Sequence, residues 1–412
     1  MKETEKLLLD ALRQSLHPQE NQGCLLLPEN EYTEREFLKM ARNHAVLPLL
    51  YDAYEKQGLA EDTRYANFRQ QIRQVAATTA RANYRLLFVV KYITELLEKE
   101  SILIILLKGA STASYYPTPE LRKSGDVDIL IPQERDFQRA VELLEKEGFA
   151  KCESQSALHH IELKNEEGIS VELHCMLAEP FESGKMNHYL ETLLAEYRKH
   201  VEKNDSWGVA FNQPTDAYHA FYLVVHMLQH FLRAGFGLKF LCDWTVFWNR
   251  EIAAEEKETF LRLLQESGTQ GFVAALTEAC VKYLGLREEN VLFLLGDSHG
   301  VVENCPAEED WQQLAEEFME EVFISGEFGR GDKQRMVAMR GTGFAAYARE
   351  FHHQMHLNYP GVGKVFFLWP FLWALTLARF MQNNRSIRKV KSMDILKEAR
   401  RRSKLIDRMK LF

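Results

Sequence analysis

Residues 106–131, which read LLKGASTASYYPTPELRKSGDVDILI, decide the fold. An uninterrupted aliphatic run at 102–107 ends at Lys108-Gly109, and a second apolar run, DVDILI at 126–131, follows a loop that contains two prolines. Short apolar runs bounded by turn residues are typical of strands that are buried on both faces. The stretch therefore predicts two strands of one sheet.

The residues that follow complete a small mixed α/β unit, residues 101–178. An amphipathic helix is predicted at 133–147. Two further strands, at 157–164 and 169–175, are separated by Asn-Glu-Glu-Gly, which is typical of a hairpin loop.

Helical regions are predicted on both sides of this unit. Residues 1–100 place apolar side chains at steps of three and four, with a capping box at Thr33 and Glu36. Beyond residue 180 every strong apolar period is helical, at 216–232, 239–250, 257–266, 270–284 and 308–322. The expected fold class is α+β, with the sheet unit (101–178) between a helical N-terminal region (1–100) and a helical C-terminal region (179–380), followed by a basic helical tail (381–412).

Charge is distributed unevenly along the 412 residues, which carry 51 Lys and Arg against 59 Asp and Glu. Residues 385–412 contain eleven of the basic and three of the acidic residues, so residues 1–384 keep 40 against 56, a net charge of −16. An acidic body makes nucleic acid an unlikely partner. The tail could bind an anionic lipid surface, an acidic acceptor or the acidic body of the chain itself, and the last requires no outside partner.

Two further observations concern the compartment. The six cysteines never fall as C-x-x-C, which is typical of reduced thiols, and the N-terminus is a poor signal peptide, so a cytoplasmic location is expected. The longest apolar stretch, residues 365–378, has 14 residues and a central proline. Because a membrane-spanning helix needs about 20 residues, a buried helix is expected there.

Three acidic residues fall where strand geometry brings them together. Side chains alternate along a strand, so Asp126 and Asp128 project from the same side about 7 Å apart. On the last strand Glu172 shares one face with His174, which places a third carboxylate beside them. Carboxylates held in this way repel each other, and a hard divalent cation such as Mg²⁺ or Mn²⁺ removes the repulsion.

The turn after the first strand adds groups that suit a phosphate. Gly109 and Ser111 offer backbone N–H groups and a hydroxyl without an intervening side chain. Together with the carboxylates, this turn is typical of a two-metal site for phosphoryl transfer.

Several histidines are weaker candidates. His226 and His230 face one way on a helix, but HMLQH lacks the Glu of a zinc protease motif. With Asp243 they are interpreted either as residues that line a substrate pocket or as buried, hydrogen-bonded side chains. His174 is a further candidate for the substrate pocket. His352, His353 and His356 are expected in a surface loop.

The run LLKGASTASYYPTPELRKSGDVDILI, followed by ISVELHC, resembles the polymerase-beta-type nucleotidyltransferase superfamily. More narrowly, it resembles a bacterial branch of uncharacterised nucleotidyltransferases in which a helical region precedes the Lys-Gly strand end and a helical pair such as HMLQHFLRAGFGLKFLCDW follows. The resemblance covers roughly residues 40–250. This sequence departs from the superfamily pattern in having Gly-Ala-Ser at the turn, fourteen residues between Ser111 and Asp126, and Glu as the third acid.

The resemblance implies roles for particular residues. Asp126 and Asp128 would hold the metals, and Glu172 would be the third ligand or the base toward the incoming hydroxyl. Groups on Gly109 and Ser111 would hold the phosphates, with Lys108 and Arg122 as further phosphate partners.

The function implied is transfer of a nucleoside monophosphate from a nucleoside triphosphate such as ATP, with Mg²⁺ or Mn²⁺, to a hydroxyl of a small molecule or protein. Pyrophosphate is released. The alternative is a catalytically inactive nucleotide-binding or protein-interaction module. A membrane surface, contacted through residues 365–412, is a partner that the sequence allows but does not favour.

Overall fold

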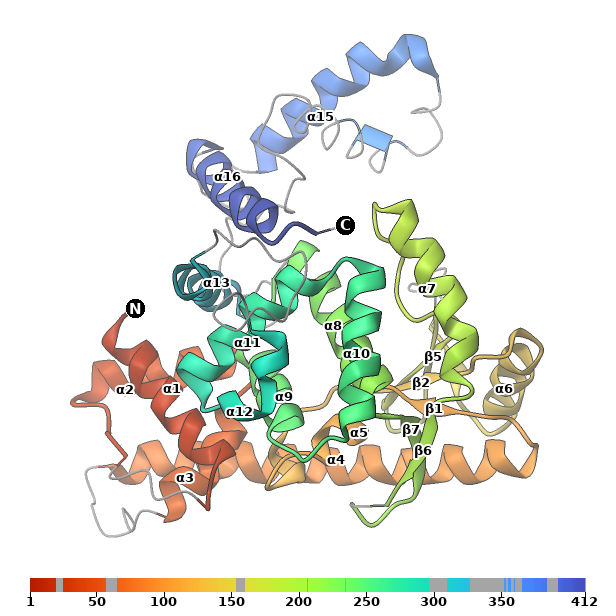
Figure 1. Ribbon diagram of the computed structural model, residues 1–412, viewed down its shortest axis with the longest axis horizontal. Coiled ribbons are helices and arrows are strands. Elements are labelled where there is room, and N and C mark those ends of the chain that lie inside the picture. The colour runs from red at the N-terminus through yellow and green to blue at the C-terminus, as the bar shows by residue number, and fades with distance from the viewer. Residues whose placement is uncertain are drawn as a thin grey trace.

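The protein was analysed as a computed structural model, shown in Figure 1. It describes residues 1–19, 25–56, 65–152, 160–205, 207–233, 235–295, 310–326, 365–383 and 392–411, together with 352, 355, 356 and 359. The architecture is α+β, as expected: a small mixed sheet lies among many helices.

The N-terminal region is helical, as predicted. Its helices are α1 (Glu3–Leu16), α2 (Glu31–Asn43), α3 (Leu50–Lys56) and the long α4 (Ala66–Lys99). The capping box of α2 lies three residues earlier than predicted, with Asn30 as the N-cap and Thr33 at the third helical position. Asn is as good an N-cap as Thr, and the Asn30 side chain accepts hydrogen bonds from the backbone N–H groups of Tyr32 and Thr33.

The main sheet has the strand order β1-β2-β5-β4-β3. Its strands are β1 (Ile105–Leu106), β2 (Asp126–Leu130), β3 (Ala150–Lys151), β4 (His160–Lys164) and β5 (Ser170–His174). The two strands that carry the predicted acids, β2 and β5, pair in parallel at the centre of the sheet, and the other pairs are antiparallel. The register places Asp126 beside Ser170 and Asp128 beside Glu172.

One face of this sheet is apolar and the other is polar. Val127, Ile129, Val171 and Leu173 form a core with residues of α4 and of α6 (Glu134–Lys146). Figure 1 shows α4 running along one side of the sheet. Because side chains alternate on each strand, burial of these four residues turns Asp126, Asp128, Glu172 and His174 to the opposite face.

A second, two-stranded sheet was not predicted. It joins β6 (Val201–Asn204) to β7 (Phe211–Pro214), in a region that was expected to be wholly helical. The two segments read VEKN and FNQP, which lack an apolar alternation that would indicate strands. The hairpin is held by burial of Phe211 in the sheet core and by a hydrogen bond from the Asn212 amide to the carbonyl of Ile104 (3.3 Å).

The other helices of the body form a bundle. They are α5 (Ala110–Ala113), α7 (Gly184–Tyr197), α8 (Asp216–Arg233), α9 (Leu238–Trp248), α10 (Ala254–Ser267), α11 (Gln270–Leu284), α12 (Glu288–Val291) and α13 (Trp311–Ser325). Two of them, α8 and α9, face the polar side of the sheet. Helix α9 is buried at nearly every position, including Trp244 and Trp248. Leucines of α1 belong to the same hydrophobic core as α9. The first helix of the chain therefore packs against the later helical bundle.

The C-terminal segments differ from each other. Helix α16 (Ser392–Arg408) docks on α13, because Arg401 and Arg402 both contact the buried Glu321, at 2.8 and 3.0 Å. The end of the basic tail therefore binds the acidic body. Helix α15 (Trp369–Asn383) is the predicted helix in the long apolar stretch, but the prediction that this stretch is buried is wrong: Phe367 is 86% exposed and Phe371 is 63% exposed. Among the described residues no helix is long and apolar enough to cross a membrane.

Candidate active site

A cavity of about 330 Å³ opens between the polar face of the sheet and helices α8 and α9. Most of the predicted site residues line it, including those that lie far apart in the sequence. The cavity is lined by Lys108, Gly109, Arg122, Lys123, Ser124, Gly125, Asp126, Glu162, Ser170, Glu172, Leu223, His226, Met227, Lys239, Phe240 and Asp243.

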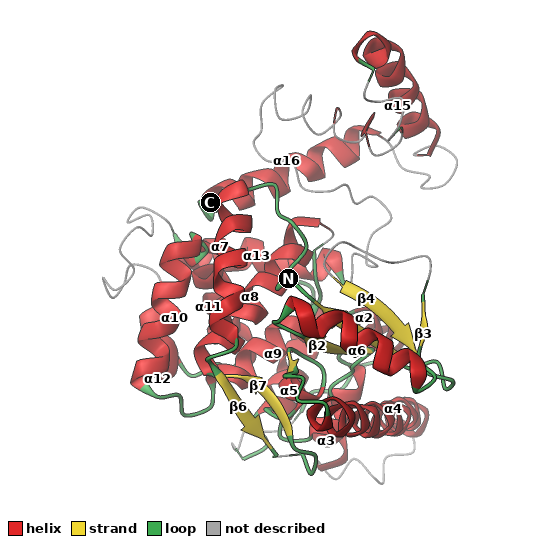
Figure 2. Ribbon diagram, turned by 90° about the vertical axis from the view of Figure 1, so that its right-hand side faces the viewer, coloured by secondary structure: helices red, strands yellow, loops and turns green. Residues whose placement is uncertain are grey.

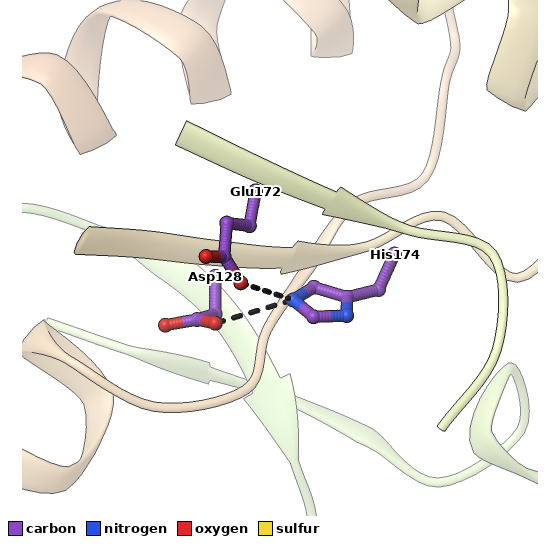
Figure 3. Close-up of side chains that lie close together, drawn as sticks. All are labelled: Asp128, Glu172 and His174. Atoms are coloured by element: carbon purple, nitrogen blue, oxygen red, sulfur yellow. Dashed lines mark hydrogen bonds and ion pairs between the residues drawn. The ribbon is translucent and has the colours of Figure 1, made fainter. Parts of the chain in front are cut away.

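Beside this cavity Asp128, Glu172 and His174 form an acidic cluster. One ligand atom from each lies within 4.8 Å of the others, and the parallel register of β2 and β5 brings them together. Figure 3 shows the three side chains converging from the two strands. His174 Nε2 lies 3.1 Å from Asp128 Oδ1 and 3.5 Å from Glu172 Oε2. Asp128 is fully buried, and Glu172 is the most exposed of the three side chains.

Lys108 adds a cation to this cluster. It follows β1, and its Nζ lies 3.1 Å from Asp128 Oδ1. Burial alone would lower the pKa of Lys108, but the charges of Asp126 and Asp128 outweigh that effect and raise it. Burial likewise acts to raise the pKa of Asp128, yet the nearby Lys108 and the hydrogen bond from His174 hold it below its usual value. The buried carboxylate is therefore ionised.

The acidic cluster fits a divalent cation. Lys108 and His174 both contact Asp128 Oδ1, whereas the buried Oδ2 accepts no hydrogen bond. A buried carboxylate oxygen without a partner is costly unless a cation binds it. Two carboxylates and one imidazole are ligands that divalent metals accept in proteins.

Asp126 was predicted to be a metal ligand, and it lies at the edge of the cluster. It lines the cavity but is not one of the three residues whose ligand atoms come within 4.8 Å of each other. Repulsion from Asp128 raises its pKa, and Lys108 opposes that effect. His174 occupies the third position instead, although the sequence placed it only as a weak substrate-pocket residue.

Arg122 and Asp243 form a buried ion pair. The guanidinium Nε and Nη2 donate to the two carboxylate oxygens of Asp243 at 2.7 and 2.8 Å, and the Tyr116 hydroxyl donates to Oδ1 at 2.6 Å. The Nη1 group of Arg122 lies 3.5 Å from the carbonyl of Gly109. Arg122 therefore connects the turn after β1 to helix α9, and its role as a phosphate partner stays a prediction.

The turn after β1 requires glycine at one position. Gly109 has a φ of +73°, and a Cβ there would lie 3.3 Å from the carbonyl oxygen of Asp126. A side chain would thus be strained and would crowd the strand that carries the acids.

Ser111 lies away from the cavity lining. It is fully buried, and its hydroxyl donates to Gln213 Oε1 on β7 at 3.0 Å. The Gln213 amide donates in turn to the hydroxyl of Tyr115, which lies 2.6 Å from His219 Nδ1. Burial is the main cause that lowers the pKa of His219, to about 3. The predicted contact between Ser111 and a phosphate stays a prediction, and its hydroxyl serves this buried network.

The histidines of α8 lie as predicted on one face. The His226 and His230 rings are 4.6 Å apart, and both pack against Phe240. Burial, with the nearby charge of Lys108, lowers the pKa of both, to about 3 for His230. They are therefore neutral, and His226 belongs to the cavity wall.

Of the C-terminal histidines, His353 lies outside the described residues. His352 and His356 contact each other, with their Nε2 atoms 3.1 Å apart. Their rings also lie within contact distance of Trp369.

The sequence reasoning missed Glu162 and Lys239, which also line the cavity. Glu162 could have been found, because the hairpin around Gly168 pairs it directly with Glu172 on β5. Lys239 offered no comparable signal, since it belongs to the helix after α8 and reaches the cavity only through the fold of the bundle.

Comparisons with known proteins give a family match and a similar solved structure. A family described as uncharacterised nucleotidyltransferases matches residues 30–285. No curated protein matches the chain. The crystal structure of an antigenic nucleotidyltransferase-like protein from Paracoccidioides brasiliensis is similar at 15% identity and a TM-score of 0.30, over 48% of this chain and 92% of that one. The family match spans more than half of the sequence and includes both acidic strands, so the chain belongs to the family of uncharacterised nucleotidyltransferases.

Proposed function

We propose that this protein transfers a nucleoside monophosphate from a nucleoside triphosphate to a hydroxyl group and releases pyrophosphate. The observation that carries the proposal is the buried oxygen of Asp128, which has no hydrogen-bond partner and lies among Glu172 and His174 beside a cavity. Membership of the nucleotidyltransferase family supports the same reaction class.

Asp128, Glu172 and His174 would hold a divalent cation, with Asp126 at the edge of the cluster. When bound, that cation supplies charge that stabilises the transferred phosphate and activates the attacking hydroxyl. Lysine side chains also surround the cavity: Lys108 lies in the cluster, and Lys123 and Lys239 line the walls. Their positive charge favours a triphosphate there.

The transfer itself exchanges one phosphorus–oxygen bond for another. The acceptor oxygen bonds to the α-phosphorus as the bond to the bridging oxygen breaks, and pyrophosphate leaves with the electron pair. The acceptor proton passes to Glu172, since its carboxylate faces the cavity while Asp128 is wholly covered. Leu223, Met227 and Phe240 give the opposite wall an apolar surface against which the base or the acceptor can pack.

The test is incubation with each nucleoside triphosphate labelled at the α-phosphate, with Mg²⁺ or Mn²⁺ and a cell extract as the source of acceptors. Labelled product and released pyrophosphate are expected. Asp128→Asn should lower the rate by about a hundredfold or more, because it deletes the central ligand. Glu162→Gln is the matched control, since the Glu162 carboxylate lines the same cavity but bonds Ser170 and Lys164.

An equal rate in Asp128→Asn and in the control would contradict the proposal. If EDTA leaves the affinity for nucleotide unchanged and no label is transferred, the protein is instead a metal-independent nucleotide-binding module. Such a module would bind the nucleotide through Lys108 and His174. These two residues already compensate the charge of Asp128 without a metal.

A further inference from the structure

Helix α4 carries a stripe of exposed aromatic side chains. Tyr84, Phe88 and Tyr92 follow one another at steps of four residues, so they lie on one face of the helix. Phe88, at the centre of the stripe, is 70% exposed, and Tyr84 and Tyr92 are also exposed. The opposite face of α4 packs in the core of the sheet. Figures 1 and 2 both show α4 at an edge of the molecule, on the other side from α15 and α16. Exposed aromatic surface of this kind marks a site of interaction.

Charged residues lie at the two ends of this aromatic stripe. Arg81 and Glu95 are each seven residues from Phe88, one before it and one after it. Because seven residues make two helical turns, both share the face of Phe88. Both side chains are exposed, and Glu95 lies 3.9 Å from Lys91 of its own helix, in an exposed pair that contributes little energy. The stripe therefore begins with a positive charge and ends with a negative one.

A groove of about 520 Å³ opens beside the aromatic stripe. The three rings lie along it, and the turn between α6 and β3 and the hairpin between β4 and β5 form its other side. The charged residues of its lining are Arg85, Glu147, Glu166 and Glu167, which is one positive charge against three negative ones. Arg85 is paired with Glu167 at 2.6 Å, so Glu147 and Glu166 give the groove a net negative charge.

The charges of this surface disfavour a partner of a single sign. A basic partner would suit the groove but would be repelled by Arg81, and an acidic partner or an anionic lipid surface would be repelled by the groove. The partner must therefore carry aromatic side chains between charges of both signs. The exposed face of α4 itself has that composition.

The order of residues on α4 suits a second copy of the chain that runs in the opposite direction. With a twofold axis at Phe88, Arg81 of one copy lies opposite Glu95 of the second copy, and Tyr84 lies opposite Tyr92. The same pairs form again on the other side of the axis. A parallel pair would instead place Arg81 against Arg81 and Glu95 against Glu95.

We propose that two copies of this protein associate through their α4 helices, which pack antiparallel about a twofold axis at Phe88. The contact runs over residues 81–95, about 21 Å of helix. It does not depend on the proposed transferase activity. Because α4 covers the apolar face of the sheet, the cavity on the polar face stays open in the pair.

Sedimentation equilibrium of the full chain at low salt tests the association. The wild type should form a dimer. Phe88→Asp should weaken that dimer at least about a hundredfold, because it removes the central ring and sets two carboxylates against each other across the axis. Tyr32→Asp is the matched control, since Tyr32 is 73% exposed on α2, outside the stripe. Its dimer should be as stable as that of the wild type.

Charge reversal tests which residues face each other. Arg81→Glu and Glu95→Arg should each weaken the dimer about tenfold, because two pairs of opposite charge become two pairs of like charge. The double variant Arg81→Glu, Glu95→Arg should restore the dimer, and so should an equal mixture of the two single variants. Arg35→Glu, which changes an exposed arginine of α2, is the control and should leave the dimer unchanged.

Three results would overturn the proposal. These are a wild type that stays monomeric at every concentration, a dimer that Phe88→Asp weakens no more than Tyr32→Asp does, and charge reversals that the double variant does not restore. Far-UV circular dichroism should be the same in all variants, which shows that a loss of association is not a loss of fold. Nucleotide affinity should also be unchanged, which separates this proposal from the proposed transferase activity.

Discussion

Ionisable side chains are buried on β2 and β5, whereas apolar side chains are exposed along residues 365–378, which include the first part of α15. Asp128 has no exposed surface, and Phe367 keeps 86% of its surface exposed. Burial of the carboxylate costs folding free energy because it removes a charge from water, whereas a ring that stays exposed contributes almost nothing to folding. Lys108 and His174 compensate the buried carboxylate, while within residues 365–378, whose side chains are described, only Leu372 and Thr376 are buried.

The comparison teaches that each region matches a different kind of ligand. A partly compensated buried charge with an unpartnered oxygen suits a small charged ligand, for which the compensating groups can move aside. An exposed apolar helix suits a large apolar surface. The variants below test the two halves of this contrast, from the largest expected effect to the smallest.

Arg122→Ala should be the most damaging change, because it leaves the buried carboxylate of Asp243 without its cation. Removal of one partner of a buried ion pair costs about 3–5 kcal/mol of unfolding free energy. Urea denaturation measures this value. Arg85→Ala removes an exposed pair with Glu167 and should cost less than about 1 kcal/mol. Similar values for the two variants would mean that the buried pair is not needed to stabilise the site.

Ser111→Ala should destabilise the protein by about 1 kcal/mol without weakening nucleotide binding. The Ser111 hydroxyl donates to Gln213, and its loss leaves that buried amide oxygen with one donor fewer. Urea denaturation and titration calorimetry with a Mg²⁺-nucleotide give the two numbers. A clear loss of nucleotide affinity at unchanged stability would restore the phosphate-binding role that the family resemblance implies.

His174→Gln should change how stability depends on pH in the metal-free protein. Burial acts to lower the pKa of His174, but hydrogen bonds to Asp128 and Glu172 raise it overall, and Lys108 and His160 are the other charged or titratable neighbours. A raised folded-state pKa adds stability that is fully present below the unfolded value of about 6.5 and is lost as pH rises through the folded value. The difference in unfolding free energy between wild type and variant should therefore shrink above about pH 6.5. A difference that is constant with pH would show that folding leaves the pKa of His174 unchanged.

Phe367→Ser should have the smallest effect, within about 0.5 kcal/mol of unfolding free energy, since little of the ring is buried. Thermal unfolding measures it. A loss of several kcal/mol would mean that the ring is covered in solution, and the contrast between α15 and the sheet would then fail.

The acidic strands could be predicted because their signal is local. Alternation along 126–130 and 170–174 fixes which side chains share a face, and buried Val127 and Val171 leave the acids on the other face. The same reasoning could not yield the pairing of Arg122 with Asp243, which lie 121 positions apart on a loop and a helix. Nor could it predict that the start of α15 is exposed, because an apolar run in a sequence indicates burial whatever its position in the fold. The neighbouring helix α16 docks on α13 through contacts that the sequence does not reveal.

The pairing of Arg122 with Asp243 also limits how this protein could be rearranged, in evolution or in the laboratory. The strands that carry the acids end at His174. The positive charge of Arg122 beside them, however, is balanced by Asp243 of α9. Leu223 and Phe240, which also lie beyond the strands, form the opposite wall of the cavity. Transplanting residues 101–178 alone into another protein would carry the acids without their cavity and would bury an unbalanced guanidinium. The smallest transferable module therefore extends through α9, which means that recombination within residues 179–248 separates parts that must be inherited together.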